Sequence, residues 1–105
     1  MSNSLFRLRV LEPPEDPREG RAIPLPTGST TVGRRGDVTL GSRELGVGSM
    51  HFRIEIAGST AELIDNGTQS GTFVNGVRID RVPLASGDTV QFGHVKVRFE
   101  EQPQD

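Results

Sequence analysis

A serine and a histidine lie close together in the stretch GVGSMHFRIEI, which spans residues 46–56. Such a pair can form a nucleophile and its general base, with a carboxylate such as Asp65 or Asp37 orienting the ring. The same two residues can instead hold a loop in shape through hydrogen bonds. No nucleophile elbow surrounds Ser49, and a single residue separates it from His51 at an expected loop–strand junction. The sequence therefore favours a binding or structural role over an enzyme.

The second histidine gives no support to a metal site. It lies in the turn-like sequence Phe92-Gly93-His94, where we expect a surface position. Two distant histidines without any cysteine make a poor ligand set for a metal ion. We therefore predict no metal site and no cofactor.

Apolar and polar residues alternate through most of the chain, as they do in strands with one buried and one solvated face. Phe52, Ile54 and Ile56, for example, alternate with charged residues. Strands are expected near residues 6–10, 22–25, 30–33, 38–40, 52–56, 60–65, 72–74, 77–79, 82–84, 89–92 and 95–99. No segment has a convincing helical period, so the pattern predicts an all-β sandwich or barrel of about ten or eleven short strands.

Turn residues separate these strands. Asn75-Gly76 stands between two strand-like segments and predicts a hairpin with a type I′ turn, in which both central residues need positive φ. The loops at 41–50 and 65–71 contain more Gly, Ser, Thr and Asn than a plain hairpin requires. Function on a β-sandwich usually resides in loops of this kind.

Length and charge limit the classes of protein. A chain of 105 residues suits a single domain over residues 1–105, with a core at 5–100, a polar loop at 12–20 and a tail at 101–105. A net charge of −2 gives no general attraction to nucleic acid or to acidic membranes. The first ten residues lack a long apolar run, so we expect no signal peptide or membrane span, and a cytoplasmic location.

Several short motifs follow one another in a specific order. They are Gly33-Arg34, Asp37-Val38-Thr39-Leu40, Val47-Gly48-Ser49-Met50-His51, Asp65-Asn66-Gly67-Thr68-Gln69-Ser70-Gly71-Thr72, Asn75-Gly76, Leu84, Gly87-Asp88 and Phe92-Gly93. In this order the chain resembles the forkhead-associated (FHA) domain family from about Thr31 to Phe99. The resemblance implies an eleven-stranded β-sandwich of two twisted sheets, which binds phosphothreonine peptides with loops at one end.

Arg34 matches the arginine that binds phosphate in this family. The planar guanidinium suits bidentate contact with phosphate, and hydroxyl groups and exposed backbone N–H groups supply further donors. The alternative is a solvated arginine in a turn, which is the role expected for its neighbour Arg35.

The first binding loop departs from the family. The serine that donates to phosphate three residues before the histidine is Gly48 here, and Ser49 follows one place later. Gly48 then donates only through its backbone, or a shifted loop brings in Ser49 or Ser42, or phosphate binding is weak.

The second binding loop departs as well. Thr68 keeps a hydroxyl, Gln69 occupies a place where some members contact phosphate, and Ser70 replaces an asparagine that holds the peptide main chain. Gly71 keeps the bare backbone of the family, although a turn with positive φ explains it equally well.

The remaining motif residues are expected to support the loops. In the family the histidine holds the binding residues in place, which implies a structural His51. The other supporting residues are Gly33, Thr68, Thr72 and Asn75, and Asp65 and Asp88 are expected as turn-capping acceptors. Arg78 and Arg81 either add positive charge near the binding end or are solvated strand residues.

The resemblance implies a phosphothreonine-peptide binding module that mediates protein–protein interactions in Ser/Thr kinase signalling. Its partner would be a phosphothreonine-containing protein or peptide, either a kinase or a kinase substrate, and the module would be part of a larger protein or assembly. The alternative, motivated by Gly48 and Ser70, is a degenerate FHA module that acts as a phosphate-independent assembly scaffold.

Overall fold

The computed structural model describes residues 3–13 and 18–104. It contains β1 (Asn3–Glu12), β2 (Ala22–Leu25), β3 (Gly28–Gly33), β4 (Val38–Thr39), β5 (Phe52–Ala57), β6 (Thr60–Asp65), β7 (Thr72–Val74), β8 (Val77–Ile79), β9 (Arg81–Pro83), β10 (Thr89–Phe92) and β11 (Val95–Gln104). The described residues contain no helix, so none could cross a membrane as a helix. The predicted all-β fold and its eleven strands are confirmed.

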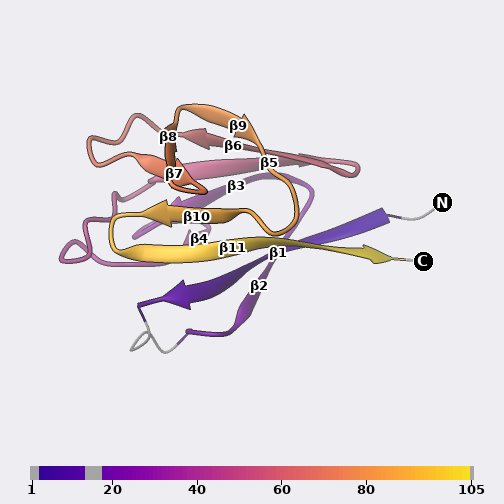
Figure 1. Ribbon diagram of the computed structural model, residues 1–105, viewed down its shortest axis with the longest axis horizontal. Coiled ribbons are helices and arrows are strands. Elements are labelled where there is room, and N and C mark those ends of the chain that lie inside the picture. Colours follow the sequence, from indigo (N-terminus) through magenta and orange to yellow (C-terminus); the bar gives the residue numbers. More distant parts are fainter. Residues whose placement is uncertain (1–2, 14–17, 105) are drawn as a thin grey trace.

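The strands form two sheets that pack face to face (Figure 1). The six-stranded sheet has the order β2-β1-β11-β10-β7-β8, and the five-stranded sheet has the order β4-β3-β5-β6-β9. All pairs are antiparallel except β3 with β4. This arrangement is the predicted sandwich.

The alternating pattern of the strands produces the core. The fully buried aromatic side chains are Phe52, Phe92 and Phe99, and the rings of Phe52 and Phe92 meet edge to face at 4.9 Å. Burial of each such side chain stabilises the fold by about 1.5–3 kcal/mol. The core therefore fixes the strand ends from which the loops leave.

Three arginines surround one carboxylate on the outer face of the six-stranded sheet. Arg7, Arg9 and Arg98 each place Nε within 3.0 Å of the Glu100 carboxylate. Arg9 and Arg98 are direct cross-strand partners, so the charge of the glutamate also offsets the repulsion between these two arginines. Hydrogen bonds from Arg9 and then Arg7, reinforced by Arg98, lower the pKa of Glu100 from 4.5 to about 2 against the opposing effect of burial.

The end of the chain differs from the prediction. Residues 101–105 were expected to form a tail, but β11 continues to Gln104 and pairs with β1 as far as Asn3. The ends of β1 and β11 form a ribbon that projects from the sandwich, on the side away from the 41–50 and 65–71 loops (Figure 1). A two-stranded ribbon does not need an apolar face toward the core, so its polar sequence gave no strand pattern. The predicted loop at 12–20 lies partly outside the described residues.

The hairpin prediction is confirmed by the backbone. Asn75 has φ of 52° and Gly76 has φ of 85°, the positive values that a type I′ turn requires. The turn joins β7 to β8 and places the start of β7 directly after the 65–71 loop.

Candidate functional site

Three loops meet at one end of the sandwich: the turn after β3, the segment between β4 and β5, and the segment between β6 and β7. Backbone hydrogen bonds join the first two, from Arg34 N–H to Gly48 O at 3.1 Å and from Arg35 N–H to Ser49 O at 2.8 Å. A Cβ atom on Gly33 would lie 2.6 Å from Ser49 O, so only glycine allows this close approach. Gly33 therefore sets how the loops meet.

The Arg34 side chain lies against the 41–50 loop. Its Nε donates to Val47 O at 2.7 Å, which fixes the plane of the half-buried guanidinium. Within residues 3–13 and 18–104, its terminal nitrogens Nη1 and Nη2 make no hydrogen bond. The Nε–H group thus holds the guanidinium in place, while Nη1 and Nη2 remain available to a ligand.

His51 connects the two long loops from a fully buried position. Gly48 N–H donates to Nδ1 at 3.0 Å, so Nδ1 carries no proton and Nε2–H donates to Gly71 O at 2.8 Å. Both ring nitrogens are therefore engaged with backbone groups, and neither serves Ser49, which is exposed. This geometry supports the interpretation of His51 as a structural brace.

Asp65 organises the second loop. Its Oδ1 accepts hydrogen bonds from the hydroxyl groups of Thr68 and Thr72, both at 2.7 Å, and its Oδ2 accepts from the N–H groups of Gly67 and Thr68 at 3.0 Å. Burial alone raises the pKa of Asp65, but the hydrogen bonds from Thr72, Thr68 and Gly67 outweigh it, and the pKa is lowered. Asp65 is the turn-capping acceptor that the sequence predicts.

These contacts form one hydrogen-bonded chain across the site. Gly48 donates to His51, His51 donates to Gly71, Gly71 N–H donates to the Thr68 hydroxyl at 3.1 Å, and Thr68 donates to Asp65. Each residue in this chain provides a hydrogen-bonding partner for the next, so the loss of one residue would loosen both loops.

A groove of about 480 Å³ lies between the two loops. Its lining residues are Arg43, Gly46, Val47, Gly48, Thr68, Gln69 and Ser70. We call this feature the loop groove. It contains three of the predicted binding residues, Gly48, Gln69 and Ser70. Arg34 and Ser49 do not line it, although Arg34 contacts the lining residue Val47 through Nε, and Gly71 lies buried behind the groove.

The hydroxyl groups near the loop groove are partly engaged. Ser70 Oγ donates to Gly46 O at 3.2 Å and so connects the two loops. Ser42 Oγ accepts from Leu45 N–H at 3.3 Å inside its own turn. Ser42 therefore braces the loop, and Gly48 leaves the groove without a hydroxyl at the position where the family carries one.

The other candidate residues lie at different distances from the loop groove. Asn75 braces the β7–β8 turn through Asp88 Oδ1 and Thr89 N–H, both at 3.0 Å, and it does not line the groove. Arg78 donates to Gln69 O at 3.2 Å and supports the second loop from behind. Arg43 also lines the loop groove. It belongs to none of the predicted motifs, because its position beside the groove depends on how the turn at 42–46 folds.

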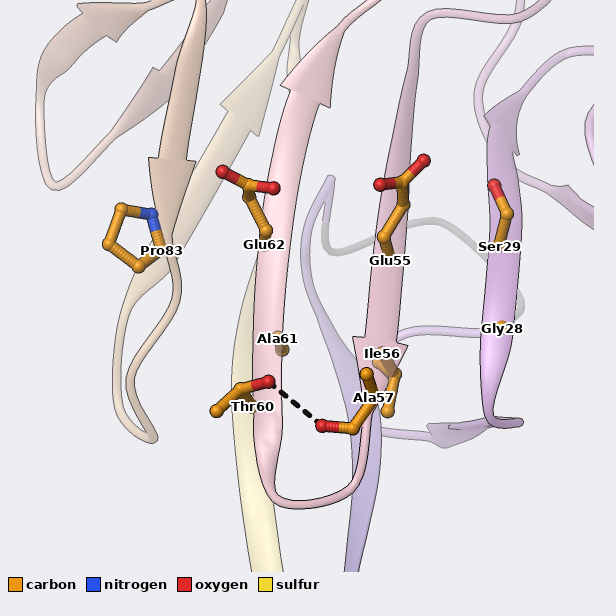
Figure 2. Close-up of a pocket in the computed structure, with 9 residues that line it drawn as sticks. All are labelled: Gly28, Ser29, Glu55, Ile56, Ala57, Thr60, Ala61, Glu62 and Pro83. Carbon is orange, nitrogen blue, oxygen red and sulfur yellow. Dashed lines mark hydrogen bonds between the residues drawn. The ribbon is translucent and has the colours of Figure 1, made fainter.

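A separate hollow of about 540 Å³ lies at the opposite end of the five-stranded sheet (Figure 2). Figure 2 shows Glu55 and Glu62 side by side on neighbouring strands, where they are direct cross-strand partners. Arg81 forms an ion pair with Glu62 at 2.6 Å, so Arg81 does not add charge to the binding end. With two carboxylates on its surface, this hollow is unsuited to a phosphate group, and none of the predicted binding residues lines it.

Comparison with known proteins places this geometry in a family. The family model of the FHA domain matches residues 30–93. The glycogen accumulation regulator GarA of Mycolicibacterium smegmatis is 30% identical over 83 residues, which are 79% of this chain and 52% of that protein. The chain spans about half the length of the curated GarA relatives it matches.

Solved structures agree with this match. A structure from a study of phosphothreonine-dependent FHA domain interactions has a TM-score of 0.79 at 28% identity, covering 91% of this chain and 95% of that chain. Mycobacterium tuberculosis EmbR in complex with a low affinity phosphopeptide also has a TM-score of 0.79, at 25% identity, covering 91% of this chain and 24% of that one. The family match covers more than half of the residues, and so the chain belongs to the FHA domain family.

Proposed function

We propose that this FHA domain binds phosphothreonine peptides at the loop groove and thereby mediates protein–protein interactions in Ser/Thr kinase signalling. The observation that carries the proposal is the Arg34 guanidinium, which is fixed through Nε to Val47 O while its terminal nitrogens have no partner among the described residues. Phosphopeptide binding by FHA relatives agrees with this use of the arginine.

The groups around Arg34 suit a phosphate dianion. A planar guanidinium can donate two parallel hydrogen bonds to phosphate oxygens. The N–H groups of Ser49, Gln69 and Ser70 have no acceptor within the described part of the chain, so they can donate to a bound peptide. We propose that Arg34 holds the phosphate, that Gly48 and Gly71 let the peptide approach the backbone, and that these N–H groups complete the site.

The remaining parts of the proposal concern the protein as a whole. We propose a binding module without catalytic activity, because both ring nitrogens of His51 are engaged with backbone groups. We also propose that residues 1–105 form one domain, that the domain works in the cytoplasm as part of a larger protein or assembly, and that its partner is a Ser/Thr kinase or a kinase substrate.

A second candidate function is phosphate-independent assembly. The absent hydroxyl at Gly48 and the engaged hydroxyl of Ser70 favour it, since both reduce the donors available to phosphate. In this case the loop groove would bind a partner without discriminating phosphorylated from unphosphorylated threonine.

Binding to a fluorescent peptide pool separates the two functions. The pool has one fixed threonine with mixed flanking residues and is prepared with and without phosphate on that threonine. We expect binding of the phosphorylated pool only, and a loss of about tenfold or more in Arg34→Ala, because a charge-assisted hydrogen bond contributes about 1.5–3 kcal/mol.

Arg35→Ala is the matched control, because Arg35 is exposed and its side chain makes no hydrogen bond within the described residues. Its binding should equal that of the wild type. Equal affinity for both pools, or an unchanged affinity in Arg34→Ala, would refute the phosphate site.

A further inference from the structure

Arg43 lies at the tip of a tight turn that faces the loop groove. The turn is closed by hydrogen bonds from Leu45 N–H to Ser42 O at 3.2 Å and from Gly46 N–H to Arg43 O at 3.0 Å. Val47, which is buried in the core, anchors the turn through its own N–H bond to Ser42 O at 3.1 Å. The backbone position of Arg43 is therefore fixed, although its side chain is exposed.

The guanidinium of Arg43 has no hydrogen-bonding partner in the described part of the chain. It makes no hydrogen bond or ion pair there, yet the residue lines the loop groove together with Gly48 and Ser70. Arg43 is the only charged residue of the seven that line this groove. An unpaired cation beside a groove without anionic side chains offers a contact for an anionic ligand.

Arg43 and Arg34 adjoin the same groove, because Arg43 lines it and Arg34 Nε donates at 2.7 Å to the carbonyl oxygen of Val47, which also lines it. The pKa of Glu44 is lowered first by a hydrogen bond from its own backbone N–H, then by the Ser42 hydroxyl, and further by attraction to Arg43 and to Arg34. Both guanidinium groups therefore lie within electrostatic reach of one carboxylate. A doubly charged phosphate in this region would be attracted by both more strongly than a single carboxylate.

We propose that Arg43 is a second cationic contact for the phosphate of a bound phosphothreonine peptide, and that it compensates for the hydroxyl absent at Gly48. This inference rests on the proposed function of the loop groove. In it, Arg34 holds the phosphate through its terminal nitrogens beside Val47, and Arg43 approaches from the turn at 42–46.

The test measures peptide binding by wild type, Arg43→Gln, Arg43→Lys and Arg21→Gln. Arg21→Gln is the charge-matched control, because Arg21 is exposed and does not line the loop groove. The probe is the fluorescent phosphothreonine pool described above, in one version with mixed flanks and in one without acidic residues.

Arg43→Gln should weaken binding of both pools by about tenfold or more, and Arg43→Lys by less, because lysine keeps the charge but loses the bidentate contact. The affinity of Arg43→Gln should also depend less on salt concentration than that of the wild type, since one screened attraction is removed. The melting temperature should not change, because the side chain makes no hydrogen bond within the described residues.

The other outcomes separate this inference from the proposed function. If the wild type binds the phosphorylated pool and Arg43→Gln binds as well as Arg21→Gln, the role of Arg43 is refuted while phosphopeptide binding stands. A loss confined to the pool with mixed flanks, which is the one that contains acidic residues, would place Arg43 on a peptide side chain and refute its phosphate contact. Absence of phosphate-dependent binding in the wild type would overturn both proposals.

Discussion

Gly48→Ser should tighten phosphothreonine binding. The substitution places a hydroxyl at the position in the loop groove where the family carries its phosphate-binding serine. The backbone accepts the change, because Gly48 is not among the glycines with positive φ. A Cβ atom there would lie 3.4 Å from Thr68 Cγ2 and 3.6 Å from His51 Nδ1, which are ordinary contact distances.

The size of the gain follows from the hydroxyl alone. A hydrogen bond to a charged oxygen is worth about 1.5–3 kcal/mol, and each 1.4 kcal/mol is a factor of about ten in affinity. Gly48→Ala is the matched control, since it adds the Cβ atom and the same restriction of the unfolded chain without the hydroxyl. We therefore expect Gly48→Ser to bind about tenfold or more tightly than Gly48→Ala.

Isothermal titration with one phosphothreonine peptide selected from the pool measures this difference. Ser49→Ala is included because a shifted loop would make Ser49 the donor. The structure leads us to expect no loss in Ser49→Ala, since Gly48 lines the loop groove and Ser49 does not. Equal affinities of Gly48→Ser and Gly48→Ala would show that a hydroxyl at position 48 does not contact the phosphate, and a clear loss in Ser49→Ala would make Ser49 the donor.

Two further substitutions test the support of the site, and a third tests the ion-pair cluster on the six-stranded sheet. His51→Ala should lower the free energy of unfolding by about 3 kcal/mol and weaken binding, since it leaves a cavity and unpaired loop groups; a variant that melts like the wild type would argue against the brace. Asp65→Ala should lower the free energy of unfolding, measured by chemical denaturation, by roughly 3 kcal/mol, because it removes the acceptor of four donors. A variant as stable as the wild type would show that the second loop does not depend on Asp65. Glu100→Gln should lower the free energy of unfolding by about 1–3 kcal/mol at pH 7, because it removes the charge that the three arginines contact. Because folding lowers the Glu100 pKa from 4.5 to about 2, the wild type loses this contribution as the pH falls through that window, so a variant with the same pH dependence would contradict the assignment.

Most of the strands could be predicted because their alternation is a direct consequence of one buried and one wet face. Phe52, Ile54 and Ile56 point into the core, and their polar neighbours do not. The first residues of β1 and the last residues of β11 were not predicted as strand, because their ribbon extends beyond the core. Strand pairing there depends on main-chain hydrogen bonds, which leave little trace in side-chain type.

The site was predictable where a motif fixes the local geometry. Gly33, His51 and Asp65 have roles that follow from close backbone approach and from loop hydrogen bonds. Arg43 was not predictable, because its distance from Gly48 depends on how the turn at 42–46 folds back over the loop groove. An exposed arginine in a polar loop has the same sequence appearance whether it faces a groove or open water.

The most direct test of phosphothreonine recognition is an amide NMR titration of the ¹⁵N-labelled domain with one peptide in phosphorylated and unphosphorylated form. We expect saturable shifts with the phosphorylated peptide, concentrated at residues 33–35, 43–50 and 68–71, and no shifts with the unphosphorylated peptide. Equal shifts with both peptides, or shifts centred on the hollow beside Glu55 and Glu62, would contradict it.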